Sequence, residues 1–460
     1  MKYTQMKRII LKSLPYLLFH LISIFCQANG LTMKLFPIHS PHLQILPKSF
    51  TTHDRQQFLV NISLSRALQV QNKHPKLAPD SIKSAISYLD DNFLITNITI
   101  VNKSLRYTAY VIVDTLRDLT WIQCFRCNPC FLQRNPFPAE RWSSFTRMSL
   151  DDLRCAPHIY YNGSCGFEDS YGNGHTEGYL GKATFMFQAD GPGDVDINQY
   201  YPNIGFGCGI RNHNFLFNIF GGENEIAGVL GLSPGPRSFI NQLDMVIKER
   251  FSYCLVPFLP ISGSASATTL SFGDDAKIGG DDERKVQTFE FKPDAHHFAY
   301  LGAILVNGVR LHIDPIIFKL DELEYQTGFF IGLTSPLTLL ARPAYSAVRR
   351  AMVDHFKKYG WLPMERTLVY DLCYTQVMSG NQVYPTMAFN FLKSPNDKGE
   401  IQFIIPPENL FANMGVMGTG FCLQMLPTDG LSVLGAFQQV NHKFLFDLKN
   451  KLVSFIPQKC

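Results

Sequence analysis

The stretch YVIVDTLRDLTWIQC, residues 110–124, decides how this chain folds. An apolar run rich in β-branched residues ends in Asp114-Thr115, and a second apolar run comes after a short turn. This arrangement brings the carboxylate of Asp114 to the end of a strand, where it can reach the bottom of a cleft. Leu116, however, stands where a small residue is expected after Asp-Thr. The stretch therefore predicts either a working catalytic loop or the remains of one.

Length and composition describe an ordinary globular protein. The chain has 460 residues, more than one compact core normally holds, so two domains or lobes are expected. Hydrophobic residues make up 46% and charged residues 17% of the chain. The net charge of +4 is small for this length, and no basic tract is interleaved with aromatic residues. A nucleic-acid partner is therefore not expected.

The N-terminus has the order of a secretory signal peptide, which we assign to residues 1–28. A basic segment is followed by a short apolar core and by small residues, with cleavage expected near Ala28 or Gly30. A membrane anchor is the alternative, but the apolar run is shorter than the ~20 residues that span a bilayer. No later segment is long and apolar enough, so no span is expected after signal removal.

The segment 29–88 differs from the rest of the chain and is predicted to be a pro-segment. It begins rich in Pro and His and continues with helical spacing and basic residues. An N-terminal extension without fixed structure is the alternative. The signal predicts a secreted protein, either extracellular in the apoplast or vacuolar. Glycosylation sequons, compatible with this route, begin at Asn61, Asn97, Asn102 and Asn162.

The cysteines also fit an oxidising compartment. Of the 11, Cys26 lies in the signal. The others are predicted to form disulfides whose pairing spacing alone does not give: Cys124, Cys127, Cys130, Cys155, Cys165, Cys208, Cys254, Cys373, Cys422 and Cys460. The run CFRCNPC could instead suggest zinc, but it has three sulfurs and no nearby pair of spaced His or Cys ligands. No metal or cofactor is expected.

From about residue 90 the sequence predicts an all-β protein in two halves, 89–275 and 276–460. Short runs of Val, Ile, Phe, Tyr and Thr are bounded by Gly, Pro, Asn and Asp, and a polar connector at 273–285 divides them. Helical patterns occupy only 237–251 and 342–359. In each half an apolar strand ends in a turn, and a later strand ends in Leu-Gly. Two such halves predict a cleft at their junction.

Several motifs, in this order, resemble the plant pepsin-type aspartic peptidases of the nepenthesin-like branch. The resemblance covers about residues 90–460 and rests on DLTWIQCFRCNPCF, YGNGHTEGYL, FGCG, AGVLGLSPGPRS, FSYCLVP, DLCY, PPENLF and SVLGAFQQVNHKF. It implies a bilobal pepsin-like acid protease fold. Two β-barrel-like lobes related by a pseudo-twofold axis would hold a peptide or protein in the cleft of a monomer. The segment containing MKLFPIHSPH is similar to the family's pro-segment.

The resemblance also implies a mechanism. One Asp from each lobe holds a water between them, and the pair shares a proton because two such close carboxylates do not both ionise. One Asp acts as the base on the water and the other as the acid on the peptide carbonyl. Each Asp lies in an Asp-Thr/Ser-Gly triplet. The Gly allows close backbone approach and the hydroxyls brace the two loops against each other.

The first triplet here is Asp114-Thr115-Leu116, followed by Arg117 in place of the usual Ser. A branched residue at a position that demands Gly strains the loop by about 1–3 kcal/mol or displaces it. Arg117, if it pointed inward, would hold Asp114 as an anion.

The second triplet departs further. Gly332 stands at the position of the second Asp, Leu333 at that of the hydroxyl residue and Thr334 at that of the Gly. The nearest upstream acids, Asp321 and Glu324, are too far along the strand, and a one-residue shift would turn the strand inside out. The dyad is thus predicted to be reduced to one carboxylate.

Other family positions are kept. Tyr171 matches the flap tyrosine and Trp121 the tryptophan that hydrogen-bonds behind it, although simple aromatic packing is an alternative for both. Asn173 replaces the common flap Asp, and apolar-Gly pairs stand at 230–231 and 434–435. At least one family bridge is expected to be absent before the flap, and analogy suggests a bridge between Cys373 and Cys422.

Three functions remain open. The first is a secreted protein of this family without peptidase activity, which binds a peptide or a partner or is a decaying gene copy. The second is an active endopeptidase working at acid pH through Asp114, which requires an unrecognised acid or a sequence or gene-model error at residue 332. The third is a xylanase-inhibitor-like protein that binds a microbial hydrolase, because such inhibitors resemble this fold with incomplete catalytic residues.

Overall fold

Most of the predicted lobes is described by the computed structural model. The described residues are 30–37, 54, 56–64, 94–103, 105–115, 117–171, 174–190, 196–215, 217, 224–233, 235–257, 268–279, 285–293, 297–322, 326–333, 335–364, 370–376, 384–413 and 420–460. The predicted signal peptide and much of the predicted pro-segment lie outside them. So do Leu116, Asn173 and Thr334.

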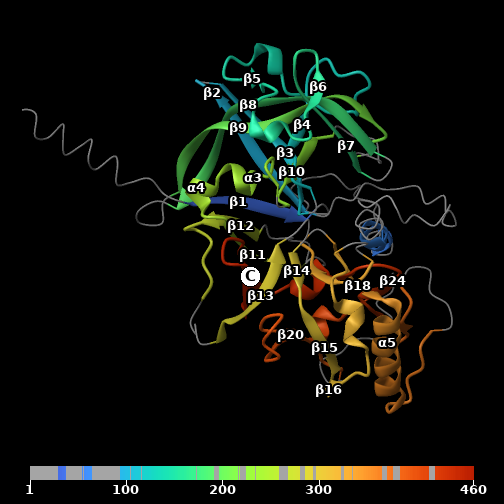
Figure 1. Cartoon of the computed structure of the whole chain (residues 1–460). Coiled ribbons are helices and arrows are strands. Elements are labelled where there is room, and N and C mark those ends of the chain that lie inside the picture. Colours follow the sequence, from blue (N-terminus) through green and yellow to red (C-terminus); the bar gives the residue numbers. More distant parts are fainter. Residues whose placement is uncertain are drawn as a thin grey trace, which may run out of the picture.

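The chain is mostly β-strand and forms two lobes, one above the other in Figure 1. The upper lobe contains β2 (Leu94–Asn102), β3 (Leu105–Asp114), β4 (Trp121–Gln123), β5 (Thr146–Arg147), β6 (Ile159–Tyr161), β7 (Ser164–Tyr171), β8 (Gly174–Asp190), β9 (Asp196–His213) and β10 (Ile226–Gly231). The lower lobe contains β14 (His297–Ala299), β15 (Leu301–Val306), β16 (Val309–Arg310), β17 (Phe329–Ile331), β18 (Thr338–Ala341), β19 (Cys373–Tyr374), β20 (Met387–Leu392), β21 (Glu400–Ile405), β22 (Phe411–Asn413), β23 (Phe421–Leu423), β24 (Met425–Thr428) and β25 (Ser432–Leu434). The predicted all-β, bilobal fold is therefore confirmed.

A single antiparallel sheet joins the lobes. Its strands lie in the order β1–β12–β11–β26–β27–β13. Their bounds are β1 (Gly30–Pro37), β11 (Arg250–Cys254), β12 (Thr268–Gly273), β13 (Gln287–Pro293), β26 (His442–Asp447) and β27 (Leu452–Pro457). The first strand comes from the predicted pro-segment and also pairs with β2 and β8, so this part of the segment belongs to the folded sheet.

The repeat seen in the sequence becomes the same strand arrangement in each lobe. In the upper lobe β10 runs parallel to β3 and antiparallel to β4, and in the lower lobe β25 runs parallel to β17 and antiparallel to β18. The amide of Gly231 donates to Thr120 Oγ1 at 3.1 Å, and that of Gly435 donates to Thr338 Oγ1 at 2.9 Å. A side chain at either glycine would collide with the backbone of the crossing segment, so both positions require Gly.

The helices are short except for one. The pattern at 237–251 forms two short helices, α3 (Phe239–Gln242) and α4 (Asp244–Ile247), and its end enters β11. The second pattern forms α5 (Arg342–Lys357), which starts with Pro343 in its first turn. Residues 56–64 are also helical. Short 3₁₀ helices are η2 (Ala139–Arg141), η3 (Leu153–Cys155), η5 (Pro315–Phe318), η6 (Pro407–Asn409) and η7 (Ala436–Gln439).

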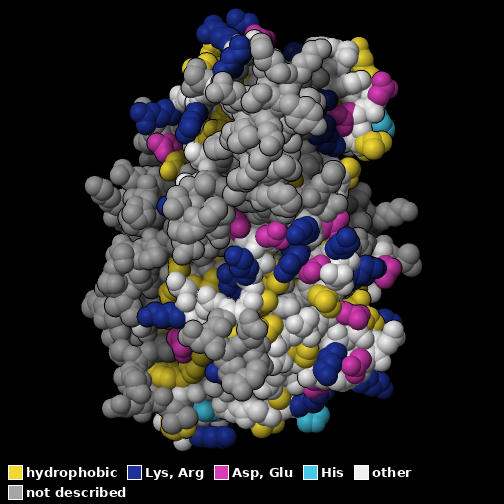
Figure 2. Space-filling model, turned by 90° about the vertical axis from the view of Figure 1, so that its left-hand side faces the viewer, with side chains coloured by type: hydrophobic (Ala, Val, Ile, Leu, Met, Phe, Trp, Pro, Cys, Tyr) yellow, Lys and Arg dark blue, Asp and Glu magenta, His cyan; other side chains and the backbone are white. Residues whose placement is uncertain are grey.

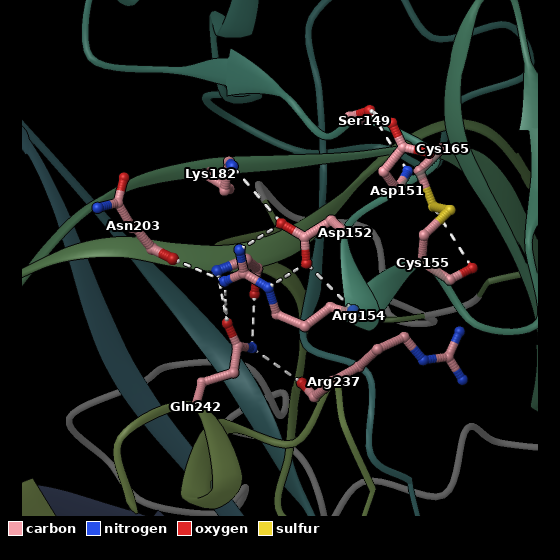
Figure 3. Close-up of polar contacts among 11 residues, drawn as sticks. Ser149, Asp151, Asp152, Arg154, Cys155, Cys165, Lys182, Asn203, Arg237 and Gln242 are labelled. Atoms are coloured by element: carbon pink, nitrogen blue, oxygen red, sulfur yellow. Dashed lines mark hydrogen bonds and ion pairs between the residues drawn. A yellow bond between two sulfur atoms is a disulfide. The ribbon is translucent and has the colours of Figure 1, made fainter. Parts of the chain in front are cut away.

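A polar cluster fastens separate segments of the upper lobe (Figure 3). The Arg154 guanidinium forms two bonds to the Asp152 carboxylate, at 2.7 and 2.8 Å, and donates to the carbonyl oxygen of Asn203 at 2.7 Å. It also donates to Gln242 Oε1 at 3.1 Å, while Lys182 Nζ lies 3.5 Å from Asp152. The hydrogen bond from Arg154 lowers the pKa of Asp152 to about 2. The cluster therefore holds η3, β8, β9 and α3 together.

Five disulfides pair all ten cysteines that come after the predicted signal. The pairs are Cys124–Cys208, Cys127–Cys130, Cys155–Cys165, Cys254–Cys460 and Cys373–Cys422. The last is the bridge that analogy suggested. Because the sulfurs of CFRCNPC are all in disulfides, none of them is available to ligate zinc. The bridge between Cys254 and Cys460 closes the longest loop, with a sequence separation of 206.

Charge is mixed on the face shown in Figure 2, where basic and acidic side chains of the described residues are intermingled. This pattern agrees with the small net charge of +4. Among the described residues, no helix has the length and apolar character needed to cross a membrane.

Candidate functional site

Asp114 is the last residue of β3 and its side chain is buried, with 1% of its surface exposed. Its backbone oxygen accepts from the amide of Leu232, directly after β10, at 2.8 Å. The parallel pairing of β3 with β10 therefore fixes the position of this carboxylate. Asp114 thus lies at the end of a strand, as the sequence predicted.

Thr115 is the next residue along the chain, and its buried hydroxyl is unusual. Its Oγ1 has no hydrogen-bond partner in the described part of the chain. The equivalent position of the second loop is Leu333, which is buried and has no hydroxyl to offer. An unpaired buried hydroxyl destabilises a fold by about 1–3 kcal/mol. The geometry thus indicates that the brace implied by the resemblance lacks its second half.

The second loop begins at Gly332, directly after β17. The amide of Gly332 donates to the carbonyl oxygen of Leu434 at 3.1 Å, and its own oxygen accepts from Gln439 Nε2 at 3.1 Å. A Cβ at this position would lie 2.6 Å from Cγ2 of Val433 on β25. The space in which an Asp side chain would begin is therefore filled by a valine methyl group.

Tyr171 and Trp121, which the resemblance assigns to the flap, are in contact. Trp121 Nε1 donates to the hydroxyl of Tyr171 at 2.9 Å, and this hydroxyl donates to Asp169 Oδ2 at 3.2 Å. Burial raises the pKa of Tyr171 well above its usual value, and the negative charges of Asp169 and Asp114 raise it further. The phenol therefore stays protonated and donates.

Arg117 connects the first loop to the flap. Its guanidinium forms an ion pair with Asp169, 3.1 Å from Nη1 to Oδ1, and donates to the carbonyl oxygen of Ser170 at 2.5 Å. The same group lies 5.0 Å from the ring centroid of Tyr171, within the range of a cation–π contact. Asp169 was not singled out by the sequence, because the flap motif begins at Tyr171 and nothing marks an acid before it.

Residues 56–64, from the predicted pro-segment, pack against the second loop. Leu337, five residues after Gly332, donates its amide to Ser63 Oγ at 3.0 Å, and Gln56 Nε2 donates to the carbonyl oxygen of Asn413 at 2.9 Å. Both polar side chains are fully buried. Figure 1 shows this blue helix beside β18 and β24 of the lower lobe. The sequence predicted a helix here but not its partner.

The sequons differ in exposure. Asn97 and Asn162 are exposed. Asn102 is only 9% exposed, and its Oδ1 accepts from Ser143 Oγ at 2.8 Å, which disfavours a glycan there. Asn61 is half-buried and accepts from Gln57.

The fold and the two loops are those of a bilobal pepsin-like protein. Comparison with known proteins gives the same class of protein. Family models described as xylanase inhibitor N-terminal and C-terminal match residues 95–274 and 297–457. Aspartic proteinase nepenthesin-2 of Nepenthes gracilis is 30% identical, over 81% of this chain and 79% of its own. Nepenthesin-1 of the same plant is 29% identical, over 83% and 81%. The chain therefore belongs to the plant pepsin-type, nepenthesin-like aspartic peptidase family.

Solved structures show the same fold at low sequence identity. The crystal structure of edgp covers 94% of this chain and 96% of its own, with a TM-score of 0.65 and 13% identity. Conglutin gamma, a basic 7S globulin from lupine seeds, also covers 94% of this chain and 96% of its own, with a TM-score of 0.63 and 16% identity.

Proposed function

We propose that this chain is a secreted, catalytically inactive member of the aspartic peptidase family that binds a peptide or protein segment between its lobes. The observation that carries the proposal is Gly332, at the position of the second catalytic Asp. A Cβ added at Gly332 would lie 2.6 Å from a methyl group of Val433. This packing supports a loop that has adjusted to the loss of the second Asp. Five disulfides among the described residues support the secretory route.

One carboxylate does not supply the family's chemistry. Hydrolysis needs a base to take a proton from the water and an acid to give one to the carbonyl oxygen. Asp114 is placed for one of these roles. Asp169 is already compensated by the Arg117 guanidinium and accepts from Tyr171, so it is not free to share a proton with Asp114. The unpaired hydroxyl of Thr115 is a second sign that the two loops no longer act together.

Loss of catalysis does not imply loss of binding, because the parts that enclose a peptide are kept. The flap retains the contact between Tyr171 and Trp121, and the lower lobe already buries a polypeptide segment, residues 56–64. That segment bonds through Ser63 to the backbone of the second loop. If residues 56–64 are removed in the mature protein, another polypeptide can occupy the place they leave on the lower lobe.

A second candidate is a protein that inhibits a hydrolase. The description of both matching family models as xylanase inhibitor domains favours it. Pull-down of secreted fungal glycosidases with the purified protein, followed by inhibition assays, separates it from the first proposal.

The proposal is tested by incubating the purified protein with an unfolded substrate at about pH 3–5, where the family's dyad works. Samples with and without pepstatin are compared with the Asp114→Ala variant. We expect no pepstatin-sensitive cleavage. Cleavage that Asp114→Ala abolishes would favour the active endopeptidase.

A further inference from the structure

The loop after α5, residues 357–364 (KKYGWLPM), lies at the end of the lower lobe away from the other lobe. Figure 1 places the end of α5 and β16 together at the bottom of the molecule. The turn before β16 is fastened to the helix by Asn307 Nδ2 and His355 Nδ1, which lie 2.9 Å apart. We call residues 357–364 the distal loop.

The distal loop has a fixed shape. Trp361 donates its amide to the carbonyl oxygen of Phe356 at 3.1 Å, and Gly360 donates to that of Lys357 at 3.0 Å. Gly360 has φ of +75°, so these bonds form a Schellman motif at the helix end. The ring of Trp361 stacks on that of Phe356 with centroids 5.5 Å apart, the apolar contact that accompanies this motif. The loop is thus held in one conformation by the core beneath it.

This fixed conformation presents apolar side chains to solvent. Leu362 is 70% exposed, Tyr359 48% and Met364 42%. Val309, on the neighbouring hairpin, is 67% exposed. Exposed large apolar side chains on a rigid segment are candidates for an interaction site.

Two lysines lie beside these side chains. Lys357 and Lys358 are exposed, and neither forms an ion pair with any residue the structure describes. In the sequence, the nearest acidic residues are Asp354, one turn earlier on the same helix, and Glu365, directly after Met364 and outside the described residues. An anionic partner would therefore meet two available ammonium groups at the edge of the apolar surface.

We propose that the distal loop binds the surface of an anionic lipid bilayer. Aromatic and aliphatic side chains flanked by lysines are the composition of segments that enter the headgroup region. A stable protein interface takes about 20–30 residues a side, many more than this loop offers. The lysines would meet lipid phosphates and carboxylates, while Leu362 and Met364 enter the acyl boundary. Because the loop is already rigid, binding carries little further ordering cost.

Trp361 provides a direct measurement. The other two tryptophans, Trp121 and Trp142, are buried in the upper lobe, so a lipid-dependent change in fluorescence reports on the distal loop. The full-length protein is mixed with phosphatidylcholine vesicles with and without phosphatidylserine, and sedimentation with the vesicles is measured alongside. We expect a blue shift and co-sedimentation with the anionic vesicles only, reduced by salt.

Variants make the test specific. Leu362→Asp should abolish binding, and Lys357→Gln with Lys358→Gln should weaken it by about fivefold per lysine. Leu153→Asp, at an 88% exposed leucine of the upper lobe, is the matched control and should bind as wild type. The proposal is overturned if the wild type ignores anionic vesicles, or if the control loses as much binding as Leu362→Asp. It is also overturned if the loop instead mediates self-association that Leu362→Asp removes.

Discussion

Arg117 and Asp169 form an ion pair, 3.1 Å long, between the first loop and the strand that leads into the flap. Their side chains are only 16% and 15% exposed, so solvent screens the pair less than a surface pair. In the family pattern a small Ser stands at position 117. In this chain a charged side chain stands at that position and ties the first loop to the end of β7.

Replacing Arg117 by Ser should loosen the flap. The variant loses the ion pair, the bond to Ser170 and the contact with the Tyr171 ring, and we expect a loss of about 1 kcal/mol in unfolding free energy. Hydrogen exchange in β7 and the start of β8 should become faster. The control is Arg126→Ser, which removes an exposed ion pair with Glu140 and should leave exchange in the flap unchanged. Equal exchange in both variants would contradict the role of Arg117.

Thr115 should tolerate the loss of its hydroxyl. Its buried Oγ1 has no partner in the described part of the chain, so Thr115→Val removes an unsatisfied group and should leave stability unchanged or raise it. Thr120→Val is the matched control, because Thr120 Oγ1 accepts from Gly231 and its loss should cost about 1–2 kcal/mol. The free energy of unfolding of both variants is measured by denaturant titration. A larger loss for Thr115→Val would mean that its hydroxyl has a partner.

Restoring the second Asp alone should fail. Gly332→Asp forces a side chain against Val433, so we expect a destabilisation of about 1–3 kcal/mol and no peptidase activity. Adding Val433→Ala should recover part of the stability, since it removes the valine methyl group that lies 2.6 Å from a Cβ at position 332. Thermal melts and a peptidase assay compare the single and double variants. Full stability of Gly332→Asp would show that the loop has kept room for a carboxylate.

Buried histidine should make the protein sensitive to acid. His297 lies among the rings of Phe251, Phe291 and Phe446, and burial lowers its pKa from 6.5 to about 4. Below pH 6.5 the unfolded chain binds this proton and the folded chain does not, so stability falls between pH 6.5 and about 4. The shift corresponds to a loss on the order of 3 kcal/mol.

The measurement is the melting temperature of wild type and His297→Phe across this range. The variant should keep more of its stability in acid, because phenylalanine fits the ring cluster without a proton to gain. His442→Phe serves as a comparison, since burial also lowers the pKa of His442. Parallel curves for wild type and His297→Phe would show that another group controls the acid response.

Local patterns in the sequence predicted the strands and the repeated halves, and the resemblance to the family implied the contact between Trp121 and Tyr171. These features follow from the composition of short segments and from the order of motifs along the chain. The pairing of β1 with β12, the docking of residues 56–64 and the ion pair to Asp169 were beyond it. Each joins segments far apart in the chain or uses a residue that no motif marks. The sequence predicts a missing acid at Gly332, but only packing shows that Val433 fills the space.

The most direct test of the central claim compares the rate of peptide hydrolysis by wild type and Asp114→Ala at about pH 4, a pH that lies between the two pKa values of a working pepsin-type dyad. Products are identified by mass spectrometry so that slow cleavage is seen. The account predicts equal rates, insensitive to pepstatin, because one carboxylate does not provide both acid and base. A wild-type rate that exceeds the variant's by about a hundredfold or more, the usual scale of general acid–base catalysis, would contradict it.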